Sequence, residues 1–139
     1  MNMNLFPLLA VTVSAVLFSA CRTTPGPYAP QEAEKHDLEA TEKFVLMDPG
    51  AQHSVTCRRI QERTLDDGRL EVVPHIRNRE NRRIQVQVNC VFKDAQSIST
   101  GDETPWETLI LTENAQEAVK FTSMNNLAKR YTFRVRQAR

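Results

Sequence analysis

The sequence has few of the residues from which metal and redox centres are built. Its 139 residues include three cysteines and three histidines. His36, His53 and His75 are scattered, with no partner at the spacing of a metal site, and no two cysteines form a C-x-x-C motif. These absences argue against a metal centre or a redox centre, and they predict no metal and no other cofactor.

The motifs of the common enzyme classes are missing as well. The chain has no glycine-rich phosphate loop, no H-E-x-x-H and no G-x-S-x-G. Ser54 and Ser123 have no base placed beside them by sequence, and the paired acidic residues fall in predicted turns. The sequence therefore predicts no catalytic residues. A binding or accessory module is the first interpretation, and an enzyme of unrecognised type is the alternative.

One apolar run stands near the start of the chain, from Leu5 to Leu17. It is too short to span a bilayer comfortably. Phe18-Ser19-Ala20-Cys21 follows it, and small residues before a Cys that closes an apolar run resemble the lipobox of bacterial lipoproteins. The resemblance implies a signal peptide over residues 1–20 and a lipidated Cys21. An ordinary signal peptide or an uncleaved anchor helix, with Cys21 incidental, is the alternative.

A lipidated Cys21 would make the membrane a partner, because two or more acyl chains anchor a protein stably. Arg22 follows it and is not the Asp associated with inner-membrane retention. The lipoprotein resemblance therefore implies the periplasmic face of the outer membrane. Thr23 to Pro30 contains three prolines and a glycine, which favours an extended tether. We expect residues 21–43 to be the tether and residues 44–139 to be the folded domain.

Apolar and polar residues alternate along several stretches of the domain, which predicts strands with one buried face. Asp66-Asp67-Gly68 is a hairpin turn signal after a strand that begins near Val55. Shorter strands are expected at Leu109–Leu111 and at Val119–Phe121. Six or seven short strands predict an all-β, antiparallel β-sandwich. The clearest inward-facing series are Leu70, Val72, Pro74 and Ile76; Ile84, Val86, Val88, Cys90 and Phe92; and Tyr131, Phe133 and Val135.

Several short motifs occur in a fixed order behind the lipobox. They are Gly68-Arg69-Leu70-Glu71-Val72, Asn78, Phe92-Lys93-Asp94-Ala95, Pro105-Trp106, and Ser123-Met124-Asn125-Asn126-Leu127-Ala128 with Arg130, Tyr131 and Arg134. In that order they resemble the YcfL-like periplasmic lipoproteins over about residues 55–137. The resemblance implies an immunoglobulin-like sandwich of unassigned function, with no catalytic residues. Gln96-Ser97 departs from it, because a glycine is expected near that turn.

Cys57 and Cys90 are the thiols that remain if Cys21 is acylated. Cysteines left over in an oxidising compartment commonly pair. Cys90 lies on the buried side of its predicted strand, and Cys57 shares a face with Val55. We therefore expect a Cys57–Cys90 disulfide. The alternative is two buried free thiols that act as small apolar residues.

Basic side chains suggest a contact surface. Residues 49–139 carry fifteen basic and eleven acidic side chains, a bias that suits an anionic envelope surface and also an ordinary solvated one. We expect a patch if the strands concerned are neighbours, formed by Arg77, Arg79, Arg82, Arg83, Arg134 and Arg136. Trp106 is expected in the core or at its edge, with a loop binding anchor as the alternative. An envelope protein or the cell wall is the expected partner. Nucleic acid is not, because the aromatics are not interleaved with the basic residues.

Overall fold

The computed structural model describes residues 38–138. Residues 38–41 form one helical turn. The elements that follow are β1 (Phe44–Leu46), α3 (Pro49–Ser54), β2 (Val55–Thr64), β3 (Leu70–Asn78), β4 (Ile84–Lys93), β5 (Ser99–Glu103), β6 (Glu107–Leu111), β7 (Gln116–Ala118), β8 (Phe121–Thr122) and β9 (Arg130–Gln137).

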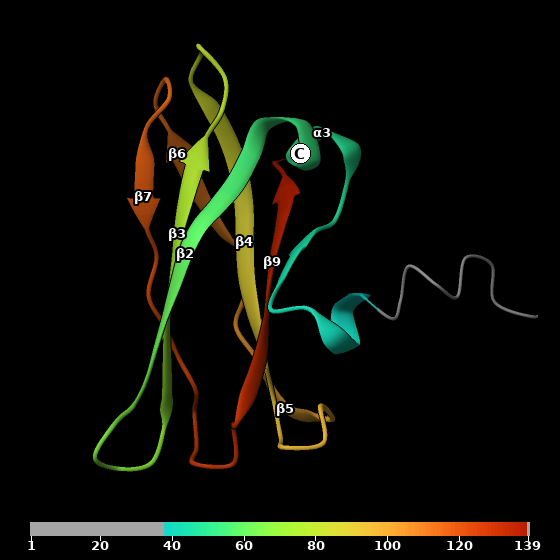
Figure 1. Cartoon of the computed structure of the whole chain (residues 1–139), viewed down its shortest axis with the longest axis vertical. Helices are drawn as coiled ribbons and strands as arrows, with labels where there is room; N and C mark the ends of the chain where they lie inside the picture. Colours follow the sequence, from blue (N-terminus) through green and yellow to red (C-terminus); the bar gives the residue numbers. More distant parts are fainter. Residues whose placement is uncertain (1–37, 139) are drawn as a thin grey trace, which may run out of the picture. The chain divides into compact units, whose positions relative to one another are not determined.

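Two β-sheets pack face to face (Figure 1). Sheet A has the order β1-β9-β4-β5, with β6 also paired to β4, and sheet B has the order β2-β3-β7, with β8 also paired to β3. The pairings are antiparallel, apart from the parallel pairing of β1 with β9. The predicted all-β sandwich is confirmed.

The core lies between the sheets, where the alternation of the sequence predicts it. Val72 and Ile76 from β3, Phe92 from β4, and Phe133 from β9 are fully buried. The strands β2 and β3 are joined at the predicted Asp66-Asp67-Gly68 turn, and Gly68 has φ 85°. Only glycine adopts this left-handed conformation without steric cost.

Two elements at the start of the domain were not predicted. The strand β1 pairs with β9 in parallel, and the ring of Phe44 stacks on Phe133 with centroids 5.8 Å apart. The short helix α3 starts with Asp48 as its N-cap, whose carboxylate accepts from the Ala51 amide at 2.8 Å, and Pro49 fits the first turn. Asp48 also accepts from the Gln137 amide at 2.7 Å, which fixes α3 to the end of β9.

The turn between β4 and β5 has no glycine where the family resemblance predicts one, and its hydrogen bonds show why none is needed. Ser97 has φ 67°, in the left-handed region that favours glycine. Its hydroxyl accepts from the Arg130 guanidinium at 2.9 Å. Asp94 accepts from the amides of Gln96 and Ile98, both at 2.9 Å. Side-chain hydrogen bonds therefore hold a conformation that a glycine would adopt without strain.

The segment before β1 contacts the sandwich. The buried Lys93 ammonium donates to the carbonyl of Glu39. The single Thr132 hydroxyl proton is shared between the same carbonyl, at 2.9 Å, and that of Glu42, at 3.1 Å. A cation at the end of a helical turn complements its unpaired carbonyls. Burial lowers the pKa of Lys93, and the nearby Glu39 carboxylate opposes that shift. Residues 38–42, which the sequence assigns to the tether, are therefore held against the outer face of sheet A.

The strand register makes a stability prediction. Replacing Phe92, which is fully buried, with Ala should lower the free energy of unfolding by about 3–5 kcal/mol, because a cavity remains in the core. Gln85 lies on the opposite face of β4 and is exposed; Gln85→Ala should cost less than about 0.5 kcal/mol. Denaturant unfolding monitored by circular dichroism measures both. The reverse order would mean that the register of β4 is shifted by one residue.

Candidate functional site

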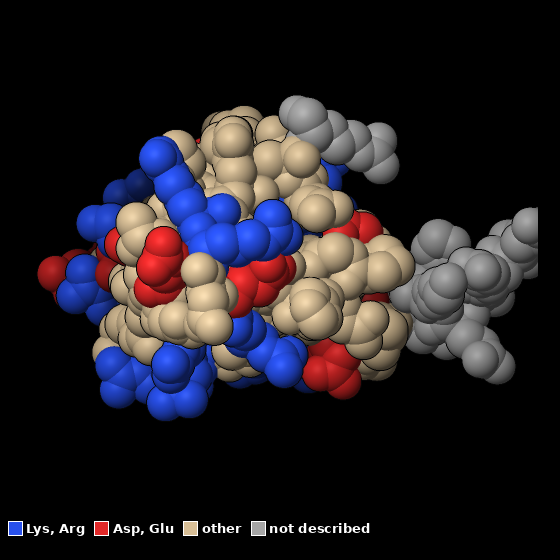
Figure 2. Space-filling model, turned by 90° about the horizontal axis from the view of Figure 1, so that it is seen from above, with Lys and Arg blue, Asp and Glu red and all other residues tan. Residues whose placement is uncertain are grey.

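The six arginines do not form one patch. Arg77 follows the inward-facing Ile76 on β3 and points out from sheet B, whereas Arg134 and Arg136 lie on the outer face of sheet A. The other three lie at the β3–β4 turn. Figure 2 views that end of the molecule and shows Lys and Arg in separate groups with Asp and Glu between them. The predicted patch is therefore wrong as a single surface, because its strands belong to opposite sheets.

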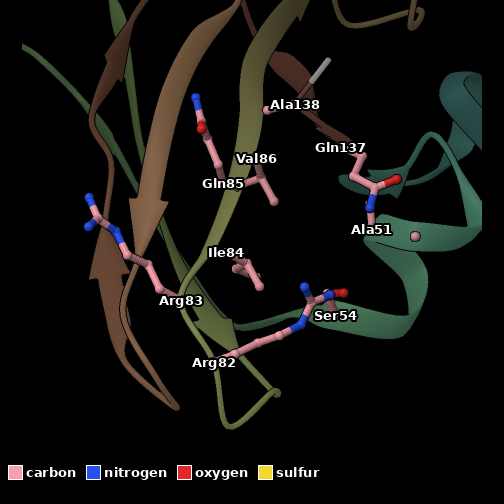
Figure 3. Close-up of a pocket in the computed structure, with 10 residues that line it drawn as sticks. Ala51, Ser54, Arg82, Arg83, Ile84, Gln85, Val86, Gln137 and Ala138 are labelled. Atoms are coloured by element: carbon pink, nitrogen blue, oxygen red, sulfur yellow. The ribbon is translucent and has the colours of Figure 1, made fainter.

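The arginines of the β3–β4 turn have different surroundings. Arg82 pairs with Glu80, which also accepts from the Ser54 hydroxyl. Hydrogen bonds from Arg82 and Ser54 lower the pKa of Glu80. Figure 3 shows Arg82 reaching toward Ser54 of α3, while Arg83 points to the other side of β4. The cavity between α3 and the start of β4 has a volume of about 160 Å³. It is too small for a typical ligand.

Trp106 does not lie in the core. It stands between β5 and β6 and covers two arginines on the outer face of sheet A. Its ring centroid lies 4.0 Å from the guanidinium carbon of Arg136 and 5.3 Å from that of Arg134. These are cation–π distances. The expected core position is therefore corrected: the indole has two cations beneath it and remains partly exposed.

Arg134 is the centre of the polar network under Trp106. Its Nε donates to Asn89 Oδ1 at 2.9 Å, and its two terminal nitrogens pair with Glu103 and, at 3.6 Å, with Glu39. Asn89 is fully buried and donates in turn to Glu103 Oε1 at 2.7 Å. Arg136 donates from Nε to Gln87 Oε1 at 2.9 Å. These two arginines are engaged by sheet A itself, which leaves them little capacity for an external anion.

The predicted Cys57–Cys90 disulfide is not formed. Cys57 and Cys90 are both free thiols. Cys90 is fully buried on the inward face of β4. Cys57 is half-buried beside a bulge in β2, where its thiol donates to the Arg59 carbonyl at 3.5 Å. The bulge directs this thiol toward the strand's own backbone. Burial raises the pKa of Cys57, and it raises the pKa of Cys90 far above its ordinary value, so both remain protonated thiols.

A hydrogen-bonded cluster closes the gap between the two sheets beside β2. Glu62 accepts from the Tyr131 hydroxyl at 2.8 Å and pairs with Lys43, whose ammonium lies 5.6 Å from the Tyr131 ring centroid. Burial favours a raised pKa for Glu62, but the hydrogen bonds from Lys43 and Tyr131 outweigh it and lower that pKa. Burial and the Glu62 carboxylate raise the pKa of Tyr131 above its usual range. The cluster holds an ionised carboxylate and a neutral phenol.

The edges of the two sheets differ in length. At one edge of sheet A, β1 has three residues, and at the other Thr104 to Trp106 separate β5 from β6. At one edge of sheet B, Val119 and Lys120 separate β7 from β8. The remaining edge is β2, with ten residues and, among residues 38–138, no strand on its second side. Among the described strands it is the one long edge at which another strand could add.

Neither a metal-binding cluster nor a large cavity occurs among the described residues. No group of three or more His, Cys, Asp or Glu within residues 38–138 could hold a metal ion. The larger cavities have volumes of about 290, 320 and 360 Å³. These volumes lie near the lower limit of small-molecule sites. Asn78 and Asn89 are fully buried, and both are used in hydrogen bonds within the fold.

Comparison with known proteins supports the fold. No protein-family model matches the chain, and no curated protein matches it. The structure of Cj0090 from Campylobacter jejuni has a TM-score of 0.56 and 13% identity, over 69% of this chain and 98% of that one. A DUF1425 family member from Shewanella sp. pv-4 also has a TM-score of 0.56, with 26% identity, over 66% of this chain and 86% of that one. The chain is therefore similar to a DUF1425 protein, and neither name states an activity.

Other predicted features lie outside the described residues. These are the signal peptide over residues 1–20, the lipidated Cys21, and residues 21–37 of the tether predicted over residues 21–43. Between residues 38 and 138 no helix has the length and apolar character needed to cross a bilayer.

The Arg134 network makes the second prediction. Arg134→Ala should lower the free energy of unfolding by about 1–3 kcal/mol, because the buried Asn89 Oδ1 would lose its donor. Arg83→Ala, a change at an exposed arginine of the β3–β4 turn, should cost less than about 0.5 kcal/mol. Thermal and urea unfolding measure both variants. Equal stability of the two variants would contradict a structural role for Arg134.

Proposed function

We propose that the protein is a non-catalytic binding module of the bacterial cell envelope, a lipoprotein of the YcfL-like type held to the membrane by lipid on Cys21. The lipobox-like sequence before Cys21 supports the anchor. The similarity to a DUF1425 structure supports the fold of this module. The small volumes of the cavities favour a binding surface over an active site.

The open edge of β2 is the observation that carries this proposal. The other edges are short or interrupted, whereas β2 is paired along one side only over ten residues. Unpaired amides and carbonyls along such an edge bind an extended segment of another protein by adding a strand. The binding mode requires no catalytic residue and no cofactor.

The side chains of β2 indicate the chemistry of the partner. Arg59, Gln61 and Arg63 are exposed, and their register with β3 places them on the outer face of sheet B. Arg63 is partly neutralised by Glu71, with Nε and Oε1 2.7 Å apart. Arg59 has no such partner among the described residues. The edge therefore favours an extended protein segment with acidic side chains, because opposite charges on neighbouring strands attract.

The same strand also limits what can bind. A bulge interrupts its pairing between Cys57 and Arg59, and charged side chains on an edge discourage indiscriminate pairing. A partner must therefore match both the bulge and the charges. These features favour one specific partner over self-association into fibrils.

The edge can be tested by site-specific photocrosslinking in intact cells. A photoreactive residue at Gln61 should give one discrete protein adduct, because Gln61 lies on the outer face at the open edge. The matched control is the same residue at Glu113, in the exposed β6–β7 turn. Adducts at both positions, or at neither, would contradict binding at β2.

Amide exchange then distinguishes strand addition from side-chain contact. In the purified complex, amides of β2 that face away from β3 should become protected from exchange by tenfold or more, that is by at least about 1.4 kcal/mol. Unchanged exchange in β2 would show that the partner contacts side chains alone.

The anchor has its own test. Cys21→Ser should abolish incorporation of an alkyne fatty acid, because the thioether forms on that sulfur, and the precursor should remain uncut. Cys57→Ser is the control, since this thiol lies within the folded domain. Equal labelling of Cys21→Ser and the wild type would contradict the lipoprotein assignment.

A further inference from the structure

The most exposed large apolar side chains of the described residues gather at one end of the sandwich. Met124 is 80% exposed, Ile98 64% and Leu127 59%. Ile98 lies in the β4–β5 connection, and the other two lie in the β8–β9 connection. Figure 1 shows both connections at the lower end, away from α3. Apolar side chains grouped on loop tips are typical of a surface that contacts a partner or a membrane.

These loops are held in place by hydrogen bonds. The Met124 amide donates to the buried Asp102 carboxylate at 2.5 Å, and the Leu127 amide donates to Asn125 Oδ1 at 2.9 Å. The Arg130 guanidinium joins the start of β9 to Ser97 at 2.9 Å. The backbone is fixed while the apolar side chains face solvent. The fold therefore holds these apolar side chains in exposed positions, and their exposure does not result from a disordered loop.

The charges around these tips are balanced. Lys129 and Arg130 are exposed next to the apolar tips. On the acidic side, Asp67 pairs with Arg69 at 2.6 Å, Asp94 accepts from backbone amides, and Asp66 is exposed in the β2–β3 turn. Basic side chains beside apolar ones suit the interfacial layer of a bilayer. The absence of a strong net charge at this end indicates that apolar contact would dominate.

The start of the described chain also lies near this end. Residues 40–43 line a cavity of about 320 Å³ together with Ser97, Lys129 and Arg130. Cys21 lies on the chain that precedes those residues. A tether keeps the domain at high effective concentration beside the membrane, so that even weak contacts are populated.

We propose that this end of the sandwich rests on the bilayer to which the protein is anchored, with Ile98, Met124 and Leu127 entering the interfacial layer. The inference rests on the lipid anchor of the proposed function. The strand β2 runs lengthwise between the two ends (Figure 1), so most of its open edge stays away from the membrane surface. The contact would orient the domain with that edge facing the periplasm.

The test uses the full lipidated chain, reconstituted into vesicles of phosphatidylcholine with phosphatidylglycerol. Trp106 is the single tryptophan, so Trp106→Phe gives a background in which Met124→Trp reports on the tip. Acyl-chain-brominated lipid should quench this tryptophan about threefold more than one introduced by Glu113→Trp in the turn at the other end. Adding Ile98→Ser and Leu127→Ser should reduce the quenching to the control level.

Lipid composition and salt separate apolar insertion from charge attraction. Quenching should persist in pure phosphatidylcholine and in high salt, because apolar contact is not screened. Quenching that is equal at the two positions, or that disappears in salt, would overturn the proposal.

Mass measurement of the purified chain first establishes the lipid on Cys21. A missing anchor, which contradicts the proposed function, is thereby distinguished from an anchored protein whose tip stays in water.

A second measurement needs no substitution. A photoreactive phospholipid in the same vesicles should label the unaltered chain in residues 94–98 and 123–129, with peptide mapping to locate the adducts. Labels confined to other segments would overturn the proposal.

In cells, photoreactive residues introduced at Ile98 and Met124 should capture lipid. Capture of a protein in place of lipid would assign this end to a protein partner and reject the bilayer.

Discussion

Strand β4 is the element on which the rest of the sandwich depends. It is paired with β9 on one side and with β5 and β6 on the other. Its inward side chains, from Ile84 to Phe92, are buried in the core. A shift of one residue would expose all of them and bury the polar series in their place. The position of every other strand in sheet A follows from this register.

Two buried asparagines then fix the positions of turns and side chains that apolar packing alone does not determine. Asn78 donates to the carbonyls of Arg82 at 2.7 Å and Thr112 at 2.8 Å, which joins the β3–β4 turn to the β6–β7 turn. Asn89 connects Arg134 and Glu103 beneath Trp106. Buried amides require such partners, because an unpaired polar group in the core is costly. Several charged residues that resemble a binding patch in sequence therefore have structural roles.

The surfaces that remain available are distinct from one another. One is the open edge of β2, which runs along the side of the sandwich. The other is the loop end that bears Met124, Ile98 and Leu127. A lipid anchor, a membrane contact at the loop end and a protein segment at the β2 edge would use different parts of the chain. All three can therefore operate at the same time, and none of them requires a catalytic group.

The sequence by itself determined the sandwich class, the hairpin turn at Gly68 and the buried faces of β3, β4 and β9, because a period of two records which side chains avoid water. It did not determine which sheet each strand joins. Contacts between residues far apart in the chain decided the remaining features. These are the parallel pairing of β1, the helix α3, the separation of the arginines, the outer position of Trp106 and the free Cys57. Alternation within a strand carries no information about such contacts, since they depend on which strands become neighbours when the two sheets close on their core.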